Sequence, residues 1–225
     1  MIDWAATLTP PDSREDYPSD EAYANFRVVT VGNVAPGTLY RSSSPIDPGQ
    51  GQRRLVADQL LAQTGVKTVV NTSDCRQLFT SFEGYDDTHY ASLNHVALRM
   101  ENDFAAEAFV QDLRNGLDFM SEQEGPYLIH GTQGVERTGY VCMVLEAFMG
   151  ASREEVLADY MRSYGDYYQL TPDSDAWQAV EAQAESYLKI FAGGQTDLAK
   201  ATENYLLQVV GLTQKQVELL REHLS

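Results

Sequence analysis

The residues with the clearest chemical potential lie in the stretch 126–150, where a short apolar run, "PYLIH", ends at His130. A tight loop with a glycine follows, and Arg137 and Thr138 then open an apolar helical segment. A strand, a loop and a helix N-terminus in this order form an anion site, because backbone N–H groups and the helix dipole both favour negative charge there. Arg137 adds a guanidinium that can donate two hydrogen bonds to one oxyanion. The stretch therefore predicts a site for phosphate or sulfate.

Two other interpretations of this stretch are weaker. An ordinary strand-to-helix turn with a surface arginine needs no ligand, but the surrounding pattern argues against it. The nucleotide-binding pattern G-x-x-x-x-G-K-[ST] fits Gly131 and Thr138 but places Glu136 where a glycine is needed. It also places Arg137 where a lysine is needed. Because the glutamate side chain would crowd and repel the phosphates, we do not expect a nucleotide loop.

A further pattern, His-Cys-x5-Arg-[Ser/Thr]-Gly, fits His130 and the run from Arg137 to Gly139, and only its cysteine is missing, because Gly131 stands there. The sequence resembles the cysteine-dependent protein tyrosine phosphatase superfamily, and most closely the bacterial tyrosine phosphatase family whose loop reads like HCTAGKDRTG. "GTLYRSSSP" and "LLAQTGVKTVVN" are similar to N-terminal landmarks of that family. "ENYLLQVVGLTQKQVELLREHL" is similar to its C-terminal helices, so the resemblance covers about residues 26–225.

The resemblance implies a role for each residue of the loop. Position 131 would carry the nucleophile that attacks phosphorus and forms a cysteinyl-phosphate intermediate. Arg137 would bind the equatorial oxygens and stabilise the transition state, Thr138 would hydrogen-bond the thiolate, and His130 would support the loop. A thiol suits this position because a helix N-terminus and an arginine lower its pKa. The implied phosphate-binding residues are Gly131, Thr132, Gln133, Gly134, Val135, Glu136 and Arg137.

A general acid is also needed to protonate the leaving oxygen, and in the superfamily it is an aspartate on a mobile loop roughly thirty residues before the cysteine. Asp103 in "RMENDF" lies 28 residues before position 131, after a predicted strand and before a predicted helix, and is the first candidate. It can also cap a helix that starts at Phe104, and the two roles are compatible. Glu136, where relatives often carry aspartate, is the second candidate.

The charge of the pocket bears on the substrate class. The family often has a lysine just before that acidic loop residue, whereas this chain has Val135, which removes a cation. Arg41 and Arg76 are candidates for charge at the rim, although a structural or solvated place is expected for each. Phosphotyrosine is the expected substrate, since a deep loop pocket suits a long aryl phosphate. Inositol phosphates or phosphoinositides are the alternative.

Two hypotheses explain Gly131. The first is an engineered replacement in an active phosphatase, which abolishes turnover but keeps binding, because removing a nucleophile costs on the order of 10⁴–10⁶ in rate. The second is a natural pseudophosphatase that binds phosphorylated partners without chemistry. The presence of Arg137 and Asp103 favours the first hypothesis, because sequence drift after a loss of catalysis would be expected to replace such residues.

Neither of the two cysteines can replace the missing nucleophile, because no arginine stands six residues after Cys75 or Cys142. We expect Cys142 in the core and Cys75 in a loop at the end of a strand. They form no CxxC pair and predict no disulfide framework. The four histidines lack metal-ligand spacing, so neither a metal nor another cofactor is expected.

Composition limits the partners. The net charge of −17 argues against nucleic acid and anionic membrane surfaces. It is compatible with a phosphorylated substrate, because salt screens a distant field over roughly 8–10 Å. No apolar run reaches the roughly 18 residues that a membrane span needs. The start has no basic n-region and no apolar h-region, so we expect a soluble protein that is either cytoplasmic or secreted with its leader removed.

The elements that must position the loop alternate between strands and helices. Strands are predicted at "VKTVVN", "HYASLNHVALRM" and "PYLIH", with a hairpin in "FRVVTVGNVAPGTLYRSS" split at "APG". Helices are predicted at "RRLVADQLLAQTG", ending on Gly65, at "FAAEAFVQDLRNGLDFM", at "RTGYVCMVLEAFMG" and at "SREEVLADYMRSYG", which opens with a Ser152–Glu155 capping box. We therefore expect an α/β fold in which helices flank a central, mostly parallel sheet, as in the tyrosine phosphatases.

Three parts of the chain are predicted. Residues 1–25 are polar, contain three prolines and read as an extended lead-in. Residues 26–172 form the phosphatase-like α/β domain. Residues 173–225 read as helices only, separated at Gly193-Gly194 and Gly211, and are expected to pack on the same domain.

Overall fold

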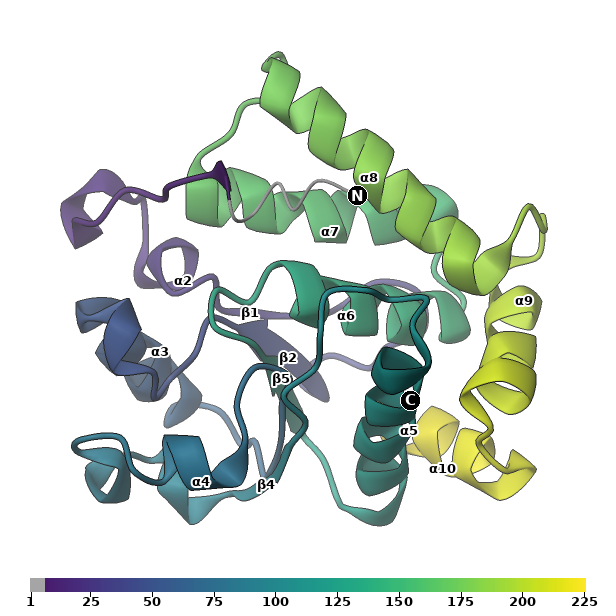
Figure 1. Ribbon diagram of the computed structural model, residues 1–225, viewed down its shortest axis with the longest axis horizontal. Helices are drawn as coiled ribbons and strands as arrows, with labels where there is room; N and C mark the ends of the chain where they lie inside the picture. The colour runs from purple at the N-terminus through teal and green to yellow at the C-terminus, as the bar shows by residue number, and fades with distance from the viewer. Residues whose placement is uncertain (1–6) are drawn as a thin grey trace.

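A mixed sheet forms the centre of the computed structural model, which describes residues 7–225 (Figure 1). Its strand order is β1-β2-β5-β3-β4. The first pair is antiparallel and the other three pairs are parallel, so the predicted mostly parallel sheet is confirmed. The strands are β1 (Arg27–Val28), β2 (Leu39–Ser42), β3 (Thr68–Asn71), β4 (Asn94–Ala97) and β5 (Tyr127–His130).

The register brings the carboxyl ends of the four parallel strands to one edge of the sheet. His130 is level with Ser42 on one side and with Asn71 on the other, and Asn71 is level with Ala97. Ligands of such sheets bind outside the carboxyl ends of the strands. The loops that leave this edge span residues 43–51, 72–75, 98–106 and 131–135. The predicted phosphate loop, which follows β5, therefore lies between the loops that follow β2 and β3.

Helices cover both faces of the sheet. A smaller core under α3 and α4 includes Leu61, Phe79 and Leu128. The larger core surrounds α6 and includes Ile129, the next residue of β5, as alternation along a strand requires. The helices are α2 (Asp20–Tyr23), α3 (Gln52–Leu61), α4 (Arg76–Phe79), α5 (Glu107–Glu122), α6 (Glu136–Phe148), α7 (Arg153–Tyr168), α8 (Asp175–Ala192), α9 (Leu198–Tyr205) and α10 (Gln214–Leu224).

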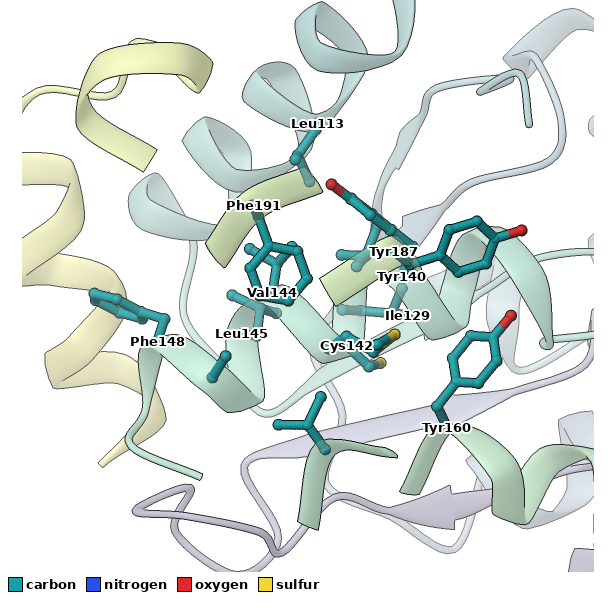
Figure 2. Packing of buried hydrophobic residues seen from close by; sticks show 14 of the residues in the cluster. Leu113, Ile129, Tyr140, Cys142, Val144, Leu145, Phe148, Tyr160, Tyr187 and Phe191 are labelled. Carbon is teal, nitrogen blue, oxygen red and sulfur yellow. The ribbon is translucent and has the colours of Figure 1, made fainter. Parts of the chain in front are cut away.

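The C-terminal helices complete the larger core. Helix α9 packs on α6, and α10 packs on α5 (Figure 1). Figure 2 shows Tyr140 and Cys142 of α6 together with Tyr187 of α8 and Tyr160 of α7. Cys142 lies in the core as expected, and burial raises the pKa of its thiol to about 12. This thiol therefore stays protonated at neutral pH and cannot serve as a nucleophile.

Several predicted boundaries are wrong in detail. Helix α3 ends at Leu61, where the Thr64 hydroxyl donates to the Leu61 carbonyl, and Gly65 lies beyond the helix. Strand β4 keeps only Asn94–Ala97 of its predicted run. The expected extended lead-in contains a 3₁₀ turn at Arg14–Asp16 and then α2, while residues 1–6 lie outside the described range. The Ser152–Glu155 capping box is confirmed.

Within residues 7–225, no helix is both long and apolar enough to span a bilayer. The same range holds no group of three or more His, Cys, Asp or Glu side chains placed to bind a metal ion.

Candidate active site

The phosphate loop between β5 and α6 is held from behind by its carbonyl groups. The Thr132 carbonyl accepts from the Ser44 N–H at 3.0 Å. The Asn25 amide donates to the carbonyls of Gln133 at 3.0 Å and Gly134 at 3.1 Å. Within the described chain, the backbone N–H groups of residues 132–135 have no hydrogen-bond partner. Carbonyls bound behind the loop turn the N–H groups to its front, which is the arrangement of an anion cradle.

Gly134 is the position where this loop touches the sheet. Its φ is +71°, in the left-handed region that favours glycine. A Cβ atom added there would lie 2.1 Å from the Ser42 carbonyl oxygen, which belongs to the backbone of β2. Only glycine therefore lets the loop rest on the end of β2.

Two threonine hydroxyls face the position that Gly131 occupies. A Cβ atom added at Gly131 would lie 2.9 Å from Thr72 Oγ1 and 3.1 Å from Thr138 Oγ1. The Thr138 hydroxyl is fully buried and has no hydrogen-bond partner among the described residues. Buried hydroxyls are nearly always paired, so this one indicates a group that belongs beside it. Sequence reasoning missed Thr72, although it directly follows β3, the neighbour of β5.

Arg137 reaches across the edge of the sheet to two other loops. Its Nη1 donates to the Met100 carbonyl at 3.0 Å and, more weakly, to the Thr72 carbonyl at 3.5 Å. Arg99, just before Met100, has a φ of +50°, which is uncommon for a residue with a side chain. These contacts fix the guanidinium beside the loop, where it can meet an anion.

His130 is buried behind the loop. Burial lowers the pKa of His130 to about 4, so the ring is neutral at physiological pH. Its Nε2 lies 3.1 Å from the Tyr90 hydroxyl, and its Nδ1 lies 3.4 Å from the Gly131 carbonyl. If Tyr90 donates to Nε2, Nδ1 carries the proton and points it at Gly131. His130 thus braces the first residue of the loop.

The first acid candidate, Asp103, lies on an exposed turn at the same edge. Its carboxylate accepts from the Ala105 N–H at 3.3 Å. Helix α5 begins only at Glu107 with Ala106 as its N-cap, so the predicted capping role for Asp103 is wrong. The reason is Phe104, which is buried with its ring centroid 4.3 Å from that of Tyr140. Phe104 anchors the turn and leaves the neighbouring Asp103 in solvent.

The second acid candidate, Glu136, is buried and faces α7 and α8. Its Oε2 accepts from the hydroxyls of Tyr160 at 3.1 Å and Tyr187 at 3.0 Å. Its Oε1 accepts from the hydroxyl of Tyr164. A carboxylate enclosed by three O–H donors acts as an acceptor, which is the opposite of what a general acid must do.

The two rim candidates lie in different environments. Arg41 is fully buried behind the loop, where its Nη2 donates to the Gly134 carbonyl at 3.2 Å, so it does not line the rim. Arg76 is exposed at the start of α4. Cys75, the N-cap of α4, is a half-buried free cysteine at the end of the loop after β3.

Glu146 of α6 is fully buried, close to Asp159. Burial, together with nearby Asp159, raises the pKa of Glu146 well above its ordinary value. Folded Glu146 therefore keeps its proton at pH values where the unfolded chain releases it. The contribution of Glu146 to the free energy of unfolding must then fall as pH rises above the pKa that Glu146 has in the unfolded chain, by about 1.4 kcal/mol per pH unit, until its pKa in the folded protein is reached.

We expect Glu146→Gln to abolish this slope, because glutamine has no proton to lose. Urea unfolding of both proteins at several pH values between about 4 and 8 measures the effect. The variant should gain stability relative to the parent as pH rises. A constant difference across this range would mean that Glu146 is ionised in the folded protein.

The sheet, the strand–loop–helix arrangement and the arginine beside the loop define a phosphatase-like class of site. The chain matches the profile of the tyrosine phosphatase family over residues 23–225, and it therefore belongs to that family. The resemblance drawn from the sequence is confirmed.

Solved structures that are similar to this chain include two phosphatases. One is the core catalytic domain of the PP-IP phosphatase SIW14 from S. cerevisiae in complex with citrate, with 16% identity and a TM-score of 0.42, covering 72% of this chain and 98% of that one. The other is a mouse putative dual specificity phosphatase complexed with zinc tungstate, with 16% identity and a TM-score of 0.38, covering 80% of this chain and 91% of that one. No curated protein matches the sequence.

Proposed function

We propose that this chain binds a phosphate monoester in the loop of residues 131–137 and does not hydrolyse it. The observation that carries the proposal is the buried hydroxyl of Thr138, which faces Gly131 and has no hydrogen-bond partner among residues 7–225. Phosphate binding is supported by the loop carbonyls that are hydrogen-bonded behind the loop, and by Arg137 beside it. The absence of any side chain at Gly131 supports loss of turnover, because no group there can form a covalent intermediate.

The reaction proposed for a form with a thiol at position 131 is hydrolysis through a cysteinyl-phosphate intermediate. Asp103 is proposed as the general acid, since it is exposed on the edge that carries the loop, whereas Glu136 is enclosed by tyrosines. The intact surroundings of Gly131 support an active phosphatase in which Gly131 is an engineered replacement over a natural pseudophosphatase whose site has drifted.

Phosphotyrosine is the substrate class that we propose. Val135 contributes no charge to the loop, and the burial of Arg41 removes one of the two candidates for positive charge at the rim. Few cations at the rim disfavour inositol polyphosphates, which carry many phosphates, relative to a single aryl phosphate.

Calorimetric titration of the chain with tungstate, a phosphate analogue, tests the binding proposal. We expect saturable binding by the parent and a loss of at least about tenfold in affinity for Arg137→Met, which removes a charge-assisted donor. Circular dichroism of both proteins would show that the fold is unchanged. A phosphotyrosine peptide should compete with tungstate more strongly than the unphosphorylated peptide. Absence of tungstate binding, or equal binding by Arg137→Met, would overturn the proposal.

A further inference from the structure

Behind the phosphate loop, two arginines share one aspartate in the interior. Arg27 of β1 donates from Nε to Asp159 Oδ1 at 2.9 Å and from Nη2 to Oδ2 at 3.0 Å. Arg41 of β2 donates from Nη1 to the same Oδ2 at 2.8 Å. The side chains are 4%, 0% and 8% exposed for Arg27, Arg41 and Asp159. Solvent therefore screens these charges little.

This cluster reaches the loop through two donors that share one acceptor. The Gly134 carbonyl accepts from Arg41 Nη2 at 3.2 Å and from Asn25 Nδ2 at 3.1 Å. Asn25 Oδ1 in turn accepts from Arg27 Nη1 at 3.2 Å, which closes a ring through Asp159. Asn25 has a φ of +47°, a left-handed conformation that asparagine tolerates better than most residues. The backbone thus adopts an uncommon conformation at Asn25, the residue that donates hydrogen bonds to the loop.

The cluster carries an excess of positive charge. Burial alone would raise the pKa of Asp159, but Arg27 and Arg41 hold it well below its ordinary value, so Asp159 is ionised. The carboxyl of Glu146 beside it stays protonated, because burial and Asp159 raise its pKa. Two guanidinium groups therefore face one carboxylate. An uncompensated charge in a poorly screened interior acts over a longer range than one on the surface.

We propose that Arg41 and Asn25 are positioning residues of the phosphate site, which hold the Gly134 carbonyl behind the loop so that the loop's N–H groups face the anion. The buried cluster to which they belong also supplies positive charge that the acidic surface and Val135 do not. The inference rests on the proposed phosphate binding at this loop. Neither residue needs to touch the ligand, so each acts through the backbone of Gly134.

The test compares tungstate affinity in the parent, Asn25→Gly, Arg41→Lys and Arg41→Met. Asn25→Gly removes the amide but keeps the backbone conformation accessible, since glycine adopts positive φ readily. We expect it to weaken tungstate binding about tenfold, because it removes the hydrogen bonds from the Asn25 amide to the Gln133 and Gly134 carbonyls. Arg41→Lys keeps the charge and should weaken binding less than Arg41→Met, which removes it. Glu146→Gln, beside the cluster, is the matched control and should bind tungstate as the parent does.

The NMR chemical shift of the Gly134 carbonyl carbon gives a second readout. It reports on the hydrogen bonds that this carbonyl accepts, so it would not change if Asn25 and Arg41 stabilised only other parts of the protein. It should change in Asn25→Gly and in Arg41→Lys with no anion present, and stay unchanged in Glu146→Gln. Folded Asn25→Gly with the parent's affinity and the parent's Gly134 shift would overturn the inference. If the parent itself does not bind tungstate, the proposed function fails, and the carbonyl shift still decides whether these residues position the loop.

Discussion

The Gly131→Cys variant is expected to hydrolyse a phosphotyrosine peptide at least about 10⁴-fold faster than the parent, which is the factor that a nucleophile typically contributes. The new thiol would lie beside the Thr138 hydroxyl, at the N-terminus of α6 and near Arg137. Each of these lowers a thiol pKa or binds the phosphate. The added Cβ would come within 2.9 Å of Thr72 Oγ1, so we expect the Thr72 hydroxyl to rotate away. Steady-state kcat/KM on the peptide measures the gain.

Gly131→Ser is the matched control, because it has nearly the same shape but no thiolate, and it should stay close to the parent rate. Inositol hexakisphosphate assayed in parallel distinguishes the two substrate classes. In the Gly131→Cys background, Asp103→Asn should lower the rate about 10²–10⁴-fold. Loss of a general acid slows substrates with poor leaving groups more than those with good ones, and Glu136→Gln should not show this difference. A folded Gly131→Cys protein that binds tungstate and remains inactive on both substrates would favour the pseudophosphatase.

Gly134→Ala is expected to lower the free energy of unfolding by more than about 3 kcal/mol and to abolish tungstate binding. The added Cβ would lie 2.1 Å from the Ser42 carbonyl oxygen and 2.4 Å from the Ser42 carbonyl carbon. Both are backbone atoms of a buried strand, so relief requires the loop to leave β2. Urea unfolding together with tungstate calorimetry measures the two losses.

Gly84→Ala separates steric overlap from conformational strain. Gly84 has a φ of +77° and a ψ of +9°, in the left-handed region, and a Cβ added there meets no atom within 4 Å. The strain of a left-handed alanine alone is about 1–2 kcal/mol. If Gly134→Ala destabilises the protein no more than Gly84→Ala does, the close contact between the loop and β2 is not what restricts position 134 to glycine.

The central elements could be predicted because their sequence signals are local. "VKTVVN" and "PYLIH" are short apolar runs and become β3 and β5, the two strands that lead into Thr72 and into the phosphate loop. The loop was recognisable from the spacing of His130 and Arg137, since that spacing is fixed by how the loop turns around an anion. These signals need no knowledge of distant parts of the chain.

The supporting residues could not be predicted because their partners are far away in sequence. Arg41 meets Asp159 and Gly134 only after β2, β5 and α7 have packed together. The early start predicted for α5 has a similar origin, since nothing in the local pattern shows that Phe104 packs against Tyr140 instead of continuing a helix. Tertiary packing overrides local propensity at both places.

Tyr187 touches both segments that the proposed reaction would need. Its hydroxyl donates to Glu136 at the end of the phosphate loop, and its ring centroid lies 4.6 Å from that of Phe104 in the turn that carries Asp103. Tyr187 therefore joins the end of the proposed phosphate loop to the turn that carries Asp103, and Tyr140 of α6 packs on the same Phe104 ring. A substitution that moves Tyr187 would be expected to disturb both segments together.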